Sequence, residues 1–266
     1  MKIKDIQEIV KSHINVSKED IKEIYESGCR TQLRFIDSCK KNKGELHKKE
    51  NSRISFEWWM PDEKWPKSKS VTSNVNRHGF RSDDFDDSEE GFIFLGCSLT
   101  EGYGLEEHET WPWIVGEYFG VKVWNLAQGG QGDDVCFINA LKWIPKLNPK
   151  AVCMLIPPYG RFNYVDTDQK EHHYSYNLNN LRNPKFPWLF DDKNIYLSML
   201  KNILGIKSIC DEYDIPFISQ SYNHKIYEES MWKQRARDKQ HPGTPYQREV
   251  SEYFINEIEG KNNGIR

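Results

Sequence analysis

Four short apolar runs along the chain alternate with segments of helical periodicity. The runs are rich in Val, Ile, Phe and Cys and end at glycine, proline or polar residues, which is typical of strands buried on both faces. The predicted strands span residues 92–95, 121–126, 151–156 and 215–220, and the predicted helices span 109–119, 133–143, 194–213 and 246–258. This alternation predicts a parallel sheet that is covered by helices on both of its faces.

The first quarter of the chain has a different pattern. Apolar residues recur at helical spacing up to about residue 40, and Ser17-Lys-Glu-Asp20 has the form of a capping box at the start of a second helix. Residues 40–53 are dense in charge and poor in apolar side chains, which favours a solvated linker. We therefore expect a helical extension and linker over residues 1–55 and one main domain over residues 56–266.

Composition excludes several classes of function. The 266 residues carry 37 Lys and Arg against 40 Asp and Glu, so no excess of one sign indicates nucleic acid or an anionic membrane surface as the main partner. The six cysteines form no CxxC pair, which argues against a structural zinc site or a redox motif. No secretory signal or membrane-spanning run is visible, so we expect a soluble protein of a reducing cytosol.

A serine follows the first predicted strand. Gly96 allows a tight exit from that strand, and Ser98 then stands at its carboxyl end. In open α/β sheets ligands bind at this edge, close to the N–H groups of helix N-termini. Ser98 is therefore a candidate nucleophile, although strand-Gly-x-Ser is also ordinary turn chemistry and needs a base elsewhere to become reactive.

A candidate base lies near the carboxyl end of the chain. Asp238 and His241 are three residues apart, just before the last predicted helix. A single turn can place both side chains on one side, with the carboxylate holding one imidazole nitrogen while the other nitrogen faces outward. Acyl transfer requires this arrangement, because the carboxylate fixes the tautomer of the base that takes the serine proton.

Taken together, these segments resemble the sequence blocks of the SGNH (GDSL-type) hydrolases. The first block is similar to Gly96-Cys-Ser-Leu-Thr-Glu-Gly102, with Cys97 where the family usually has Asp. The second block is similar to Asn125-Leu-Ala-Gln-Gly-Gly130, and the last is similar to Asp238-Lys-Gln-His241. The resemblance implies a three-layer α/β/α sandwich with a flavodoxin-like sheet. It also implies Ser98 as nucleophile, Asp238 and His241 as acid and base, and the N–H groups of Ser98 and Gly130 as oxyanion donors.

The family's third block is altered. The family places an Asn soon after the third strand, and its side-chain amide completes the oxyanion hole. Here Pro157-Pro-Tyr-Gly-Arg-Phe-Asn163 follows, so Asn163 is the nearest equivalent, one residue further from the glycine. Arg161 or backbone donors alone are the alternatives for this position. Loss of one oxyanion donor typically raises the barrier by about 2.7–4 kcal/mol, which would slow an enzyme without abolishing its activity.

We therefore expect a serine esterase that acts on an O-acyl ester, in particular an O-acetyl ester, of a carbohydrate or another small alcohol, without a metal or organic cofactor. A dinucleotide-binding loop at Gly129–Gly132 lacks the full GxGxxG spacing. An α/β-hydrolase elbow would need Gly at position 100, where this chain has Thr. Neither of these alternatives explains Asp238 beside His241.

The non-enzymatic alternative is a glycan-binding or structural module that retains the fold. Aromatic rings stack on sugars, and an aromatic-rich segment contains Trp58, Trp59 and Trp65, although covering an edge of the core is the commoner role. A polar insertion, residues 159–192, could add to such a surface. His172, His173 and His224 have no metal-ligand spacing, so we interpret them as surface or loop residues.

Overall fold

The computed structural model describes most of the chain from residue 71 to residue 263, together with two earlier strands. The described residues are 45–48, 54–57, 71–76, 78–82, 84–85, 90–158, 160–165, 171–175, 192–221, 234–238 and 241–263. The helices predicted within residues 1–40, the three tryptophans of the aromatic-rich segment and His224 lie outside these residues.

A four-stranded parallel sheet forms the centre of the fold. Its strands are β4 (Gly91–Leu95), β5 (Lys122–Asn125), β6 (Ala151–Ile156) and β9 (Phe217–Ser221). The strands lie in the order β5-β4-β6-β9, and each neighbouring pair is parallel. This is the beginning of a flavodoxin-like order, in which the chain passes first to one side of the initial strand and then to the other. The predicted parallel sheet is confirmed, and each of its four predicted strands is present.

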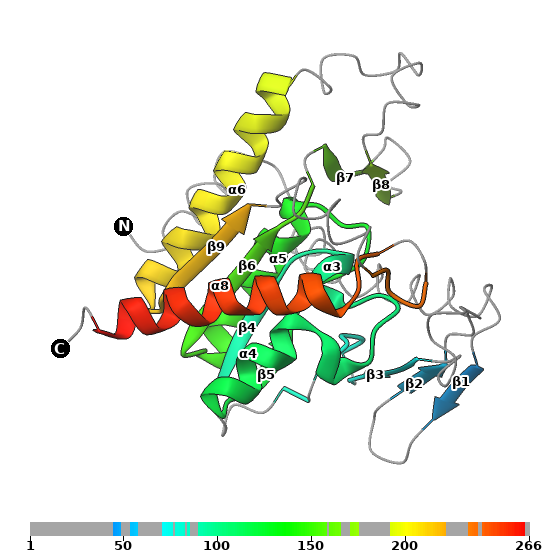
Figure 1. Cartoon of the computed structure of the whole chain (residues 1–266). Coiled ribbons are helices and arrows are strands. Elements are labelled where there is room, and N and C mark those ends of the chain that lie inside the picture. Colours follow the sequence, from blue (N-terminus) through cyan, green and yellow to red (C-terminus); the bar gives the residue numbers. More distant parts are fainter. Residues whose placement is uncertain are drawn as a thin grey trace.

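Helices cover both faces of this sheet, as Figure 1 shows. On one face α4 packs against α8, and on the other α5 packs against α6. The bounds are α4 (Trp111–Phe119), α5 (Asp133–Leu147), α6 (Asp192–Glu212) and α8 (Thr244–Asn263). The predicted three-layer α/β/α architecture is therefore confirmed. Right-handed crossovers explain it, because successive connections on opposite sides of the first strand place their helices on opposite faces.

Alternation along the strands fills two separate cores. In β4, Phe92 and Phe94 point to the α4 and α8 side, where Phe254 is fully buried against Trp111. Ile93 and Leu95 point to the other side and pack with Trp143 of α5. Because both faces of the strand are buried, its sequence has no polar residue to mark an exposed side.

A second, antiparallel sheet precedes the central one. It consists of β1 (Glu45–Lys48), β2 (Ile54–Glu57) and β3 (Thr72–Val75), in that order. Strand β1 lies in the charge-rich stretch for which the sequence predicted a solvated linker, and the division into an extension and a main domain stays a prediction. The boundary expected between residues 55 and 56 falls inside β2. Backbone pairing with the next strand stabilises β1, and a count of charged side chains does not detect this pairing.

A β-hairpin lies within the polar insertion after β6. Its strands are β7 (Arg161–Val165) and β8 (Glu171–Ser175), paired in antiparallel register. His172 and His173 lie on β8. The sequence predicted no element for this insertion.

Two further features bear on the expectations from composition. Cys97, Cys136, Cys153 and Cys210 are buried free thiols, as expected for cysteines that act as small hydrophobic side chains. Within the described part of the chain, none of the helices has the length and apolar character needed to cross a membrane.

Candidate active site

Ser98 begins a one-turn helix at the carboxyl end of β4. This helix, α3 (Ser98–Glu101), follows Gly96 and Cys97 directly, and Gly102 ends it in the left-handed conformation. The N–H groups of Thr100 and Glu101 donate to the Cys97 carbonyl. The serine therefore stands at the strand edge that the sequence predicted, with its side chain buried apart from a small exposed fraction.

The structure brings Ser98, His241 and Asp238 together across 143 residues of sequence. Nε2 of His241 lies 2.8 Å from Oγ of Ser98, and Nδ1 of His241 is hydrogen-bonded to Oδ2 of Asp238. The His241 backbone N–H also donates to Oδ1 of Asp238 at 3.1 Å. Because Nδ1 donates its proton to the carboxylate, Nε2 carries the lone pair that can accept the hydroxyl proton of Ser98.

The loop that carries the acid and base is fixed by its backbone. Arg237 N–H donates to the Gly104 carbonyl at 3.0 Å, and Ala236 N–H donates to the His241 carbonyl at 2.8 Å. Gly104 has φ +70°, and a Cβ there would lie 2.7 Å from the Asp238 nitrogen. A glycine is required at this position because it allows the loop after α3 to approach Asp238.

An ion pair anchors the same loop. Arg237 binds both carboxylate oxygens of Glu109, at 2.6 and 3.2 Å, and its side chain is only 6% exposed. Glu109 ends the 3₁₀ helix η1 (Glu107–Glu109). Burial alone would raise the pKa of Glu109, but hydrogen bonds from Arg237 and from the Glu106 N–H outweigh burial and lower that pKa. The carboxylate is thus ionised and paired with a buried guanidinium.

We expect Arg237→Met to destabilise the protein far more than removal of an exposed pair. Without Arg237, the half-buried carboxylate of Glu109 is left uncompensated, which typically costs about 3 kcal/mol of unfolding free energy. Lys207→Met is the matched control, because the Lys207–Asp211 pair is more than half exposed and is worth less than about 1 kcal/mol. Urea unfolding at pH 7 measures both losses. Equal losses would contradict the anchoring role.

The second glycine-rich loop lies beside α3. It forms a turn in which Gln131 N–H donates to the Gln128 carbonyl at 3.2 Å and Gly130 has φ +79°. The Asn125 side chain joins this loop to α3, since it donates to the Thr100 carbonyl at 2.9 Å and accepts from Ala127 N–H at 3.1 Å. Within the described residues the N–H groups of Ser98 and Gly130 make no hydrogen bond, so both are available to a ligand oxygen.

The third expected oxyanion donor lies on the hairpin. Asn163 is in β7, opposite His173 in register, and its side chain lies outside the described part of the structure, so its role stays a prediction. The alternative, Arg161, begins β7, and its carbonyl lies against Gly132 at the end of the glycine-rich loop. Nη1 of Arg161 is buried and has no hydrogen-bond partner among the described residues. Nη1 of Arg161 therefore remains the alternative candidate donor.

Sequence reasoning missed one titratable side chain in this site. Glu101, the last residue of α3, is buried and accepts a hydrogen bond from Gly129 N–H at 2.5 Å. Burial raises the pKa of Glu101 to about 7, against the opposing effects of the Gly129 N–H and the positive charge of Arg81. The only sequence signal was the position of this carboxylate between Gly96 and Gly102, in the segment that follows a buried strand.

We expect Glu101 to make stability depend on pH. Its pKa is about 4.5 in the unfolded chain and about 7 in the folded one, so folding favours the protonated form. Its contribution is therefore fully present below pH 4.5 and is lost as the pH rises through 7. Compared with Glu101→Gln, which does not titrate, wild type should lose roughly 2–3 kcal/mol of unfolding free energy between pH 5 and pH 8. Urea unfolding at the two pH values tests this, and a constant difference between the two proteins would refute it.

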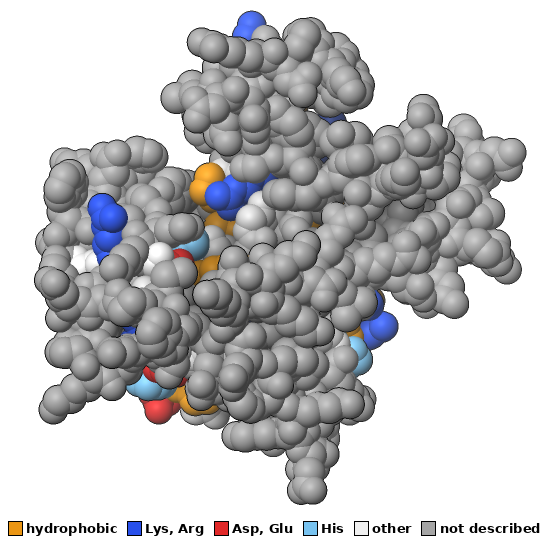
Figure 2. All heavy atoms as spheres, turned by 90° about the vertical axis from the view of Figure 1, so that its right-hand side faces the viewer, with side chains coloured by type: hydrophobic (Ala, Val, Ile, Leu, Met, Phe, Trp, Pro, Cys, Tyr) orange, Lys and Arg blue, Asp and Glu red, His pale blue; other side chains and the backbone are white. Residues whose placement is uncertain are grey.

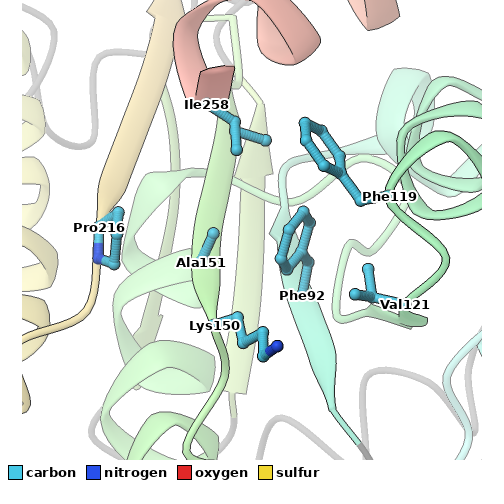
Figure 3. Close-up of a pocket in the computed structure, with 7 residues that line it drawn as sticks. All are labelled: Phe92, Phe119, Val121, Lys150, Ala151, Pro216 and Ile258. Atoms are coloured by element: carbon cyan, nitrogen blue, oxygen red, sulfur yellow. The ribbon is translucent and has the colours of Figure 1, made fainter. Parts of the chain in front are cut away.

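A cavity at the opposite edge of the sheet is separate from this site. Figure 3 shows its lining around Phe92, Ala151 and Pro216, which stand at the amino ends of strands β4, β6 and β9. Its volume is about 340 Å³, and Phe119, Val121, Lys150 and Ile258 complete the lining. Ser98 follows the carboxyl end of β4. Figure 2 shows another face of the molecule. On that face, side chains of the described residues reach the surface close to one another, and they include Lys or Arg, His and hydrophobic residues.

Comparisons with known proteins give structural neighbours but no relative by sequence. No protein-family profile matches the chain, and the search of curated proteins gives no match. A psychrotrophic esterase from Pseudoalteromonas sp. is 13% identical, with a TM-score of 0.39 over 66% of this chain and 100% of its own. An acetyl xylan esterase from the rumen bacterium Butyrivibrio proteoclasticus is 13% identical, with a TM-score of 0.35 over 74% of this chain and 68% of its own.

A third neighbour is a carbohydrate esterase whose active site displays divergent catalytic and non-catalytic binding functions. It is 9% identical to this chain, with a TM-score of 0.42 over 82% of this chain and 96% of its own. Identities and TM-scores of this size establish no activity. The function of the chain has to be inferred from the geometry of its own site.

Proposed function

We propose that the chain is a carboxylic ester hydrolase in which Ser98 is the nucleophile, His241 the general base and acid, and Asp238 the group that orients His241. The single observation that carries the proposal is the continuous hydrogen-bonded series from Asp238 through both nitrogens of His241 to Oγ of Ser98. Hydroxyl, imidazole and carboxylate in this order are the constellation that activates a serine for acyl transfer.

The proposed reaction has two half-reactions. Oγ of Ser98 attacks the acyl carbon while Nε2 of His241 takes its proton, and the N–H groups of Ser98 and Gly130 stabilise the negative oxygen of the tetrahedral intermediate. His241 then gives its proton to the leaving alcohol, and the acyl group stays on Ser98. In the second half-reaction His241 takes a proton from water, which attacks the acyl-enzyme, and then returns this proton to Oγ of Ser98 as the acid is released.

We further propose an O-acyl group, in particular an O-acetyl group, on a carbohydrate or another small alcohol as the substrate. This finer proposal rests on the resemblance of three sequence blocks to the SGNH hydrolases. The mechanism needs neither a metal nor an organic cofactor, because the proton transfers and the charge stabilisation are assigned to side chains and backbone N–H groups of the chain itself.

Hydrolysis of a series of p-nitrophenyl esters tests the proposal. We expect turnover of the acetate that declines as the acyl chain lengthens, together with release of acetate from an acetylated oligosaccharide. Turnover of the chromogenic esters without release of acetate from the sugar would retain the esterase and reject the carbohydrate substrate. Absence of any turnover by the folded wild-type protein would reject the esterase and leave the binding module as the better interpretation.

A further inference from the structure

A buried carboxylate joins the nucleophile helix to the loop that carries Gly130. Oε2 of Glu101 accepts the hydrogen bond from Gly129 N–H, although the two residues are 28 positions apart. Glu101 is 6% exposed and stands three residues after Ser98 on the same turn of α3. The helix that presents the hydroxyl therefore also holds the neighbouring loop through a direct contact.

The backbone of α3 is itself fixed in place, so the carboxylate has a rigid support. The buried guanidinium of Arg81 donates to the carbonyls of Glu101, Gly102 and Leu105, at 3.1, 2.5 and 2.5 Å. These carbonyls lie at and just beyond the end of the short helix, where backbone donors are few. The Gly102 carbonyl also accepts from Leu105 N–H at 3.2 Å, and Arg81 joins all three carbonyls, which limits the movement of the residues that carry Glu101.

The ring of Tyr103 restrains the same loop from a second direction. A Cβ on Gly129 would lie 2.5 to 2.7 Å from the ring and hydroxyl atoms of Tyr103, so the ring packs directly on the backbone of the loop. The Tyr103 ring also lies 5.4 Å from the His241 ring, centroid to centroid. The carboxylate of Glu101 and the ring of Tyr103 thus hold Gly129 between the nucleophile helix and the base.

Fixing Gly129 also fixes the next N–H group along the chain. Gly129 N–H is bound by Glu101, and Gln131 N–H is bound by the Gln128 carbonyl. The N–H of Gly130 lies between these two fixed groups and makes no hydrogen bond within the described residues. An oxyanion donor acts only when it is placed in advance at the position where the negative oxygen develops.

We propose that Glu101 is a positioning residue, which holds the Gly129–Gly130 turn so that the Gly130 N–H faces the oxygen of the tetrahedral intermediate on Ser98. Glu101 itself touches no reacting atom. The proposal rests on the function proposed above. It requires only a hydrogen-bond acceptor at the end of the side chain, so a carboxylate, a carboxylic acid and an amide all satisfy it.

Three variants test the proposal on p-nitrophenyl acetate. Glu101→Leu removes the acceptor, and we expect kcat to fall about 10- to 100-fold with a KM that changes less than about threefold, because the lost contact acts in the transition state. Glu101→Gln keeps the acceptor and should stay within about threefold of the wild-type kcat. Val250→Ala is the control for destabilisation, since Val250 is buried on α8 and makes no contact described in the site.

The amide hydrogens of the loop give a readout that does not depend on turnover. Glycine-selective ¹⁵N labelling reduces the spectrum to 17 glycines, and we expect Gly129 to exchange slowly in wild type and Glu101→Gln and at least tenfold faster in Glu101→Leu. If wild type hydrolyses no ester, the proposed esterase function fails. Independently of turnover, unchanged exchange of the Gly129 amide in Glu101→Leu would show that Glu101 does not restrain the Gly129–Gly130 turn. If wild type is active, a Glu101→Leu kcat equal to wild type, or losses that merely follow the melting temperature as in Val250→Ala, would overturn the positioning role.

Discussion

Replacement of Ser98 by alanine is expected to reduce kcat for p-nitrophenyl acetate by about 10⁶-fold, the magnitude found when the nucleophile of a serine triad is removed. The variant loses the atom that attacks the acyl carbon, while the loop that carries Gly130 and the rest of the site stay in place. KM should change little, because the hydroxyl contributes to the transition state far more than to substrate binding. Stopped-flow measurement of p-nitrophenol release for wild type and long-time measurement for the variant cover the required range of kcat.

Ser251→Ala is the matched control for this loss. Ser251 is buried like Ser98, although somewhat more deeply, and its hydroxyl donates to the Arg248 carbonyl within α8. The control should retain wild-type kcat and show only a small change in melting temperature. A Ser98→Ala variant that stays within tenfold of wild type would mean that another group performs the chemistry.

The Asp238→Asn substitution is expected to reduce kcat by about 10⁴-fold while leaving the fold intact. An amide at this position can present its NH₂ group to Nδ1 of His241, and that contact places the imidazole proton on Nε2. The imidazole then cannot accept the proton of Ser98, whose Oγ lies 2.8 Å from Nε2. The loss therefore arises from the wrong tautomer and from the missing negative charge beside the imidazolium.

Asp211→Asn provides the control for the aspartate substitution. Asp211 is exposed on α6, where it pairs with Lys207, so its neutralisation should change neither kcat nor stability measurably. The Asp238→Asn variant should also give a melting temperature within a few degrees of wild type. Full activity of this variant would show that the carboxylate only caps the loop through the His241 N–H.

The central sheet could be predicted because each of its strands has a local signature. Strand β6 has the bounds that the apolar run indicated, and β9 begins two residues later than predicted. Helix α5 is longer than predicted. It continues past Trp143, includes Pro145 and ends at Leu147, where Asn148 has the left-handed conformation. A proline near the end of a helix loses a single hydrogen bond, which packing against α6 can offset.

Hairpins that lie in polar or charged sequence could not be predicted in the same way. Strand β1 has a charged or polar residue at most positions, and it is stabilised by its register with β2. Hairpin β7–β8 lies in a polar insertion and likewise depends on its own cross-strand pairing. Strand β1 lacks the alternation of apolar and polar side chains that identifies a strand from its own residues, and in β7 the alternation covers only Arg161-Phe-Asn-Tyr164.

The same distinction holds within the candidate site. Ser98 could be identified because a glycine and a buried strand precede it, and Asp238 with His241 because three residues separate them. The contact between Glu101 and the Gly129 N–H could not, because it joins a side chain to a backbone group 28 residues away. Asn163 was placed by analogy with the family pattern, and the structure gives its backbone position on β7.

Labelling with a fluorophosphonate, followed by mass spectrometry of the digested protein, tests the central claim most directly. The reagent reacts with a serine only where a base removes the hydroxyl proton and donors stabilise the phosphoryl oxygen. We predict a single covalent adduct on the peptide that contains Ser98, with the adduct lost in both Ser98→Ala and His241→Ala. A folded wild-type protein that takes no label, or takes it on another residue, would contradict the account.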